Sequence, residues 1–110
     1  MKSTKSAIRY AKALLELSIE NSNLDEVSSD MKRIVESSNE TNDFKVFLSS
    51  PVIKSDKKIE VLKVLFVGFE KLTNSFIDLI TKNKREYLLI EIAEAYLYLF
   101  KKHQQIVPAS

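Results

Sequence analysis

The fold is decided first by residues 5–20, which read KSAIRYAKALLELSIE. On a helical wheel, apolar residues occupy most of the circumference of this stretch and the charged residues share one narrow arc. A surface helix needs an apolar arc of little more than about 100°. The surplus leaves two interpretations open: residues 5–20 are the central helix of a bundle, or they carry a second face that binds a partner. The charged residues are Lys5, Arg9, Lys12, Glu16 and Glu20.

Helical spacing of apolar residues continues along the rest of the chain. A second helix should follow Asn23 as its N-cap and end before the polar stretch 37–42. Residues 43–49 predict a short helix, with a strand as the alternative, that ends before Pro51. Ser55 is expected to cap a helix that stops at Gly68, and two more helices are expected over about 73–83 and 86–104. The fold class is therefore all-α, a six-helix bundle.

Length and composition indicate one folded domain. It has 110 residues, 45% of them apolar and 29% charged, with a net charge of +2 and no cysteine. Disulfides, thiol catalysis and thiolate metal sites are thereby excluded. The longest apolar run, 95–100, is far shorter than the roughly 20 residues that cross a membrane, so no direct membrane insertion is expected.

Catalytic chemistry has little support in the sequence. His103 lies near the end of the last helix, where a cation suits the helix dipole. Glu91 and Glu94 fit the solvated face of the same helix, and no nucleophile accompanies them. A phosphate-binding loop needs several glycines, and there is one. We therefore expect no enzyme and no catalytic, cofactor or metal site.

Two alternative functions can be stated. Lys82, Lys84, Arg85 and Tyr87 could serve a helical nucleic-acid-binding domain, although cations at a helix end are usually a solvated terminus. A small enzyme would need a polar pocket that contains His103 or a pair of carboxylates. We expect neither nucleic-acid binding nor catalysis, and favour a domain that binds another protein.

Four stretches, in order and spacing, resemble a known family. They are RYAKALL at 9–15, FLSSPV at 47–52, FIDLI at 76–80 with Asn83 and Arg85, and EIAEAY at 91–96. Together they resemble the delta subunit of bacterial F-type ATP synthase, whose mitochondrial counterpart is the oligomycin sensitivity-conferring protein. The resemblance covers nearly the whole chain.

The resemblance implies a non-catalytic stator component, which joins the catalytic head to the peripheral stalk and supports proton-driven ATP synthesis. Residues 1–105 would form the family's N-terminal helical bundle, and 106–110 would begin the linker to a missing C-terminal domain. That domain would bind the b subunits of the stalk. The N-terminal helix of an alpha subunit would lie between the first and fifth helices. The protein would be peripheral, at the cytoplasmic face of the bacterial plasma membrane.

The candidate protein-binding residues combine the surplus apolar arc with this resemblance. Lys84 departs from the family, in which a glycine is common after the asparagine. The candidates are Ser6, Tyr10, Ala13, Leu14 and Leu17 on the first helix, and Thr73, Ile77, Ile80 and Lys84 on the fifth.

Overall fold

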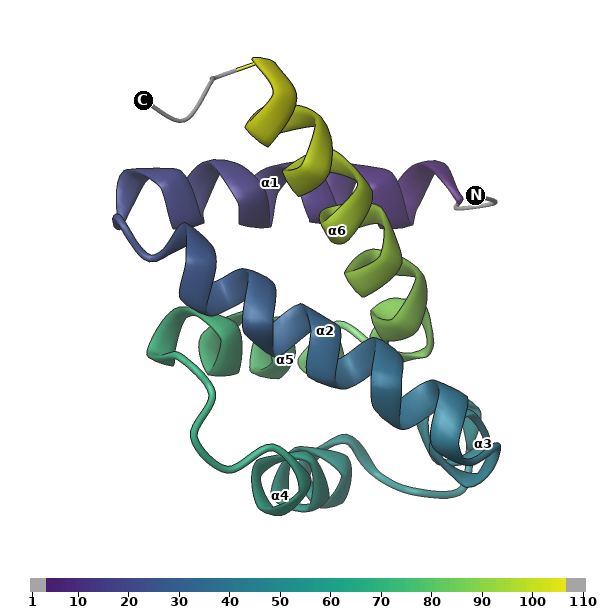
Figure 1. Ribbon diagram of the computed structural model, residues 1–110. Helices are drawn as coiled ribbons and strands as arrows, with labels where there is room; N and C mark the ends of the chain where they lie inside the picture. The colour runs from purple at the N-terminus through teal and green to yellow at the C-terminus, as the bar shows by residue number, and fades with distance from the viewer. Residues whose placement is uncertain (1–3, 107–110) are drawn as a thin grey trace.

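The computed structural model describes residues 4–106, which form six α-helices and one 3-10 helix (Figure 1). α1 lies along one edge of the molecule, crossed by α6, and α4 lies at the opposite edge. Between these edges, α2 runs diagonally in front of α5. The elements are α1 (Lys5–Glu20), α2 (Leu24–Glu40), α3 (Asp43–Ser49), α4 (Ser55–Leu65), α5 (Lys71–Lys82), η1 (Glu86–Leu88) and α6 (Leu89–Ile106).

Local sequence explains where α1 begins and ends. The Thr4 hydroxyl accepts a hydrogen bond from the backbone N–H of Ala7 at 3.1 Å and so caps the first turn. At the other end Ser22 takes a left-handed conformation, with φ of 56°. The N–H of Asn23 then reaches the carbonyl of Ser18 at 3.0 Å, which is the pattern of a Schellman motif.

The buried stripe of α1 is made of small or apolar residues at helical spacing: Ala7, Ala11, Leu14 and Ser18, all fully buried. α1 packs along this stripe mainly against α6, and Tyr96 of α6 is fully buried beside it. The Tyr96 hydroxyl lies 3.1 Å from the Ser18 hydroxyl and donates to the Leu24 carbonyl at 3.3 Å. This one hydroxyl therefore links α6 to both α1 and α2.

The predicted helix over 5–20 is confirmed, and 43–49 is a helix, not a strand. The predicted end of the second helix before the stretch 37–42 is wrong, because α2 continues to Glu40. Ser38 is buried there, and its hydroxyl donates to the Val35 carbonyl at 2.7 Å, so this polar residue is satisfied inside the helix. Asn23 is the N-cap of α2, but its side chain makes no capping hydrogen bond.

Three other boundaries differ from the predictions. Ser55 is the first residue of α4, and Lys54 is the N-cap. α4 ends at Leu65, so Gly68, with φ of 92°, shapes the loop that follows. The single helix expected from Glu86 is divided into η1 and α6. The expected linker at 106–110 lies almost wholly outside the described residues, since only the backbone of Ile106 is described.

Within residues 4–106, none of the helices combines the length and the apolar character that a membrane crossing requires.

Candidate protein-binding face

α1 and α5 run in opposite directions on neighbouring parts of the molecule (Figure 1). Their side chains meet where the rings of Tyr10 and Phe76 pack edge to face, with ring centroids 6.1 Å apart. Phe76 is buried and Tyr10 is half-buried. This aromatic contact joins the two helices.

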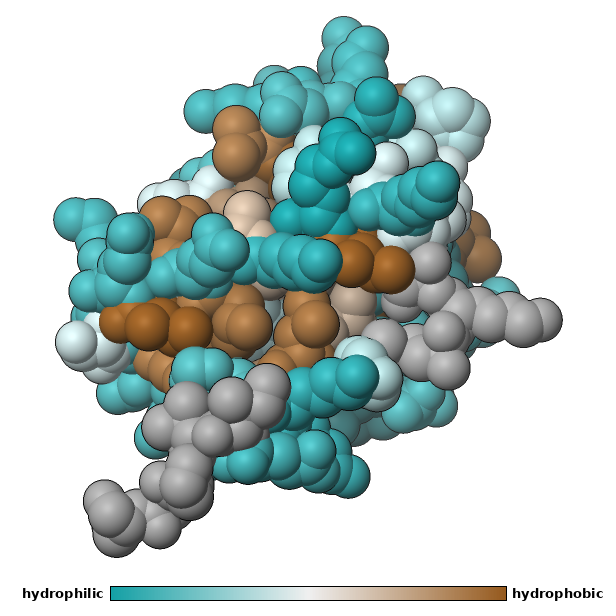
Figure 2. All heavy atoms as spheres, turned by 90° about the horizontal axis from the view of Figure 1, so that it is seen from above, coloured by the Kyte–Doolittle hydropathy of each residue, from teal (hydrophilic) through white to brown (hydrophobic). Residues whose placement is uncertain are grey.

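Apolar side chains remain exposed on either side of this contact. On α1, Leu17 is 41% exposed and Ala13 is also exposed. On α5, Leu79 is 53% exposed and Leu72 is half-buried. Figure 2, which looks down on the edge that carries α1, shows apolar side chains gathered in patches beside hydrophilic ones. The surface that α1 and α5 form around the Tyr10–Phe76 contact is called the α1–α5 face. Its residues are Ser6, Tyr10, Ala13, Leu17, Leu72, Phe76 and Leu79.

The structure places most of the α1 candidates on one flank of the helix. Ser6, Ala13 and Leu17 are exposed and Tyr10 is half-buried, and all four share the flank next to α5. Leu14 is different, since it is fully buried in the stripe that packs on α6. A partner in contact with this conformation would meet the first four residues and not Leu14.

The α5 candidates lie mostly in the core. Thr73 and Ile80 are fully buried, and Ile77 is 4% exposed. The Thr73 hydroxyl donates to Asp30 of α2 at 2.7 Å, and the same carboxylate oxygen accepts from the backbone N–H of Glu70 at 2.9 Å. Asp30 thereby caps the start of α5 from another helix. The Thr73 side chain is fully buried, so a partner could not contact it in this conformation.

The residues of α5 that line the face were missed from the sequence. Leu72, Phe76 and Leu79 follow helical spacing one position before the chosen set, so a wheel alone supports either flank. The signal that separates the flanks is the Tyr10–Phe76 contact, which requires the tertiary structure.

Lys84 is exposed and follows the end of α5 in a left-handed conformation, with φ of 60°. The N–H of Arg85 bonds to the Ile80 carbonyl at 2.7 Å, so α5, like α1, ends in a Schellman motif. Arg85 donates to the Tyr87 hydroxyl at 3.3 Å. This hydrogen bond raises the pKa of Arg85, and Tyr10 makes a smaller contribution in the same direction.

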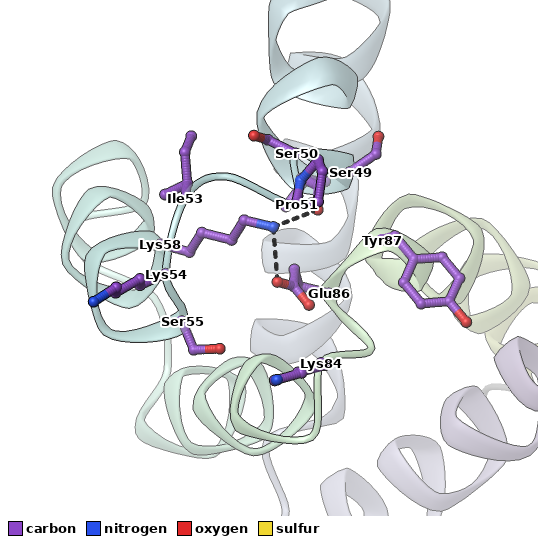
Figure 3. A pocket seen from close by; sticks show the side chains of 11 residues that line it. Ser49, Ser50, Pro51, Ile53, Lys54, Ser55, Lys58, Lys84, Glu86 and Tyr87 are labelled. Atoms are coloured by element: carbon purple, nitrogen blue, oxygen red, sulfur yellow. Dashed lines mark hydrogen bonds and ion pairs between the residues drawn. The ribbon is translucent and has the colours of Figure 1, made fainter.

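A buried ion pair fixes the segment that follows α5 (Figure 3). Lys58 of α4 is 4% exposed, and its Nζ donates to Glu86 of η1 and to the Leu48 carbonyl of α3, each at 2.9 Å. Lys58 and Glu86 line a surface pocket of about 610 Å³ with serines and lysines around them. Because both charges are paired, we read this cluster as a clamp that joins α3, α4 and η1.

Within the described part of the chain, His, Asp and Glu side chains form no group of three that could hold a metal ion. His103 is half-buried in the last turns of α6. Glu91 accepts a hydrogen bond from the Thr4 backbone N–H at 3.0 Å, so it tethers the start of α1 to α6. The α1–α5 face is a candidate for binding another protein, and Val52, Val64 and Val67 near α4 are further exposed apolar residues.

Comparison with known proteins gives a family match over nearly the whole chain. The family model for the ATP synthase delta (OSCP) subunit matches residues 7–110. The chain is 34% identical over 107 residues to ATP synthase subunit delta of Cytophaga hutchinsonii. This alignment covers 96% of this chain and 59% of that protein. It is 37% identical over 100 residues to the same subunit of Flavobacterium psychrophilum, covering 91% and 56% respectively.

A third relative is ATP synthase subunit delta of Carboxydothermus hydrogenoformans, 40% identical over 92 residues. That match covers 84% of this chain and 52% of the relative. The chain therefore spans a little more than half the length of the relatives it matches. With the family model matched over nearly all of its residues, the chain belongs to the ATP synthase delta (OSCP) subunit family.

Proposed function

We propose that this chain acts as a non-catalytic stator component of F-type ATP synthase and binds the N-terminal helix of an alpha subunit on its α1–α5 face. Family membership supports the assignment to the complex. The position of the binding site is inferred from the apolar side chains exposed on both sides of the Tyr10–Phe76 contact. A partner helix with an apolar stripe would cover it.

The geometry suits a helix as the occupant. Leu17 and Leu79 are about half-exposed on two antiparallel helices that the Tyr10–Phe76 contact joins, so a third helix could lie along both. Helix-in-groove recognition places apolar anchors at i, i+3, i+4 and i+7 against such a surface. Anchors at the centre of the face would supply most of the binding energy, with charged rims setting the register.

As a stator component, the protein would hold the catalytic head against rotation so that rotor torque drives ATP synthesis. It would do so by binding alone, with no bond made or broken. The contact with the b subunits of the peripheral stalk is proposed for the part of the relatives' length that this chain does not span. Its place would be peripheral, at the cytoplasmic side of the bacterial plasma membrane, so antibodies should label it on inverted membrane vesicles and not on right-side-out ones.

A calorimetric titration tests the binding site. The ligand is a synthetic peptide that covers the N-terminal helix of the alpha subunit from the same organism. We expect saturable binding that Ala13→Asp abolishes, because a buried carboxylate on the face has no partner. Val64→Asp is the matched control, since Val64 is 76% exposed on α4, at the opposite edge. The proposal would be rejected if Ala13→Asp and Val64→Asp lost the same affinity for the peptide, or if the unsubstituted chain did not bind it.

A further inference from the structure

Charges around the α1–α5 face are segregated along its length. Lys5, Arg9 and Lys12 lie in the first part of α1, and Glu16 and Glu20 lie in the last part; all five are exposed. One end of α1 is therefore basic and the other acidic.

The end of α5 adds to the basic end of the face. Because α5 runs opposite to α1, the residues after Phe76 lead toward the first part of α1. Lys82, Lys84 and Arg85 are exposed there. At the acidic end, α5 contributes the single exposed cation Lys71. We call Lys5, Arg9, Lys12, Lys82, Lys84 and Arg85 the basic end, and Glu16 with Glu20 the acidic end.

The sequence of charges along α1, basic first and acidic last, is the less stable arrangement for a helix. A helix is stabilised by acidic residues in its first turn and basic residues in its last turn. α1 has none of either, and carries Lys5 at its start and Glu20 at its last position. Local rules are commonly broken where function requires it. At the start of α1 an acidic group comes instead from Glu91 of α6, which accepts from the Thr4 N–H. The exposed charges of α1 itself are therefore available to a group outside the helix.

We propose that these charges fix the direction of the helix that docks on the α1–α5 face. The acidic end of the partner helix lies over the basic end of the face, and its basic end lies over Glu16 and Glu20. This inference rests on the proposed function, and adds the charge pattern and direction of the partner. The apolar centre of the face accepts a helix in either direction, whereas the reversed direction would bring like charges together.

The test separates binding from stability. In Glu16→Lys/Glu20→Lys, affinity for the alpha-subunit peptide should fall about threefold to tenfold, as expected for the loss and reversal of two rim charges. The melting temperature should not fall, because the new lysines suit the end of α1. The control Glu36→Lys/Glu40→Lys makes the same change of charge, at the same spacing, near the end of α2. It should leave the affinity within twofold of the unsubstituted chain.

Direction is measured with a nitroxide label at the acidic end of the peptide. The label should broaden the amide NMR signals of Arg9 and Arg85 and spare that of Glu20. Broadening at Glu20 instead, or an equal loss of affinity in the control, would overturn the charge assignment while leaving the binding face intact. Failure of the unsubstituted chain to bind the peptide would overturn the proposed function and this inference with it.

Discussion

Replacing Lys58 with methionine should destabilise the domain more than any surface charge change. Lys58 and Glu86 have side chains only 4% and 8% exposed, so the substitution leaves a buried carboxylate without its cation. Breaking such a pair costs about 3–5 kcal/mol. A domain of this size has a free energy of unfolding of about 5–15 kcal/mol in total. Lys58→Met should therefore remain folded at low temperature but with a large part of its stability lost.

Urea unfolding followed by circular dichroism measures this loss. With a slope of about 1–3 kcal/mol per molar urea, the midpoint should fall by roughly 2 M. The exposed pair Lys57–Glu60, at 3.7 Å and 68% and 73% exposed, provides the control. Lys57→Met should change the free energy of unfolding by less than about 1 kcal/mol, because surface ion pairs contribute little.

A double substitution separates the lost pair from lost packing. Lys58→Met/Glu86→Met removes both charges, so it should recover most of the stability that the single substitution loses. The Leu48 carbonyl would still lack its partner, at a cost of about 1 kcal/mol. A cost below about 1 kcal/mol for Lys58→Met, or a double variant no more stable than the single one, would show that the buried pair does not stabilise the domain.

Three further predictions concern stability. Burial raises the pKa of Tyr96, so the folded state keeps this proton while the unfolded chain loses it. The free energy of unfolding should thus fall as the pH rises above the unfolded pKa of about 10, and the fall should be smaller in Tyr96→Phe in unfolding curves at pH 9 to 11. Lys84→Gly should raise the free energy of unfolding by about 0.5–1 kcal/mol, since relief of the left-handed strain exceeds the added backbone freedom, and a lower melting temperature would contradict this. Asp30→Ala should cost about 2–3 kcal/mol in urea unfolding because Thr73 and the N–H of Glu70 lose their acceptor, and a cost below 0.5 kcal/mol would remove Asp30 as the cap of α5.

The helical fold could be predicted because its signals are local. Apolar spacing and one proline defined α1 and α3 to the residue. α2 was predicted too short because a run of polar residues resembles a loop, whereas Ser38 is satisfied by a carbonyl of its own helix. Local patterns show which residues are polar, but they do not show where a polar group finds its partner.

The exposure of the candidate binding residues could be predicted only in part, for the same physical reason. On α1 the charged arc identifies the solvent side, so the flank with Ala13 and Leu17 follows from the sequence. On α5 Thr73 looked like a surface residue, but its partner Asp30 lies 43 residues away in the chain. Nothing in the local sequence marks Lys58 as buried, because its partner Glu86 lies 28 residues further on. Pairings across such distances depend on tertiary structure.

The most direct test of the central claim is an NMR titration of the isotope-labelled chain with the alpha-subunit peptide. We expect the largest amide shifts on the α1–α5 face, at Ala13, Leu17 and Leu79, with little change at Val64 on α4. Saturable shifts centred on α3 and α4 would contradict the claim, because the partner would then bind at the opposite edge of the domain.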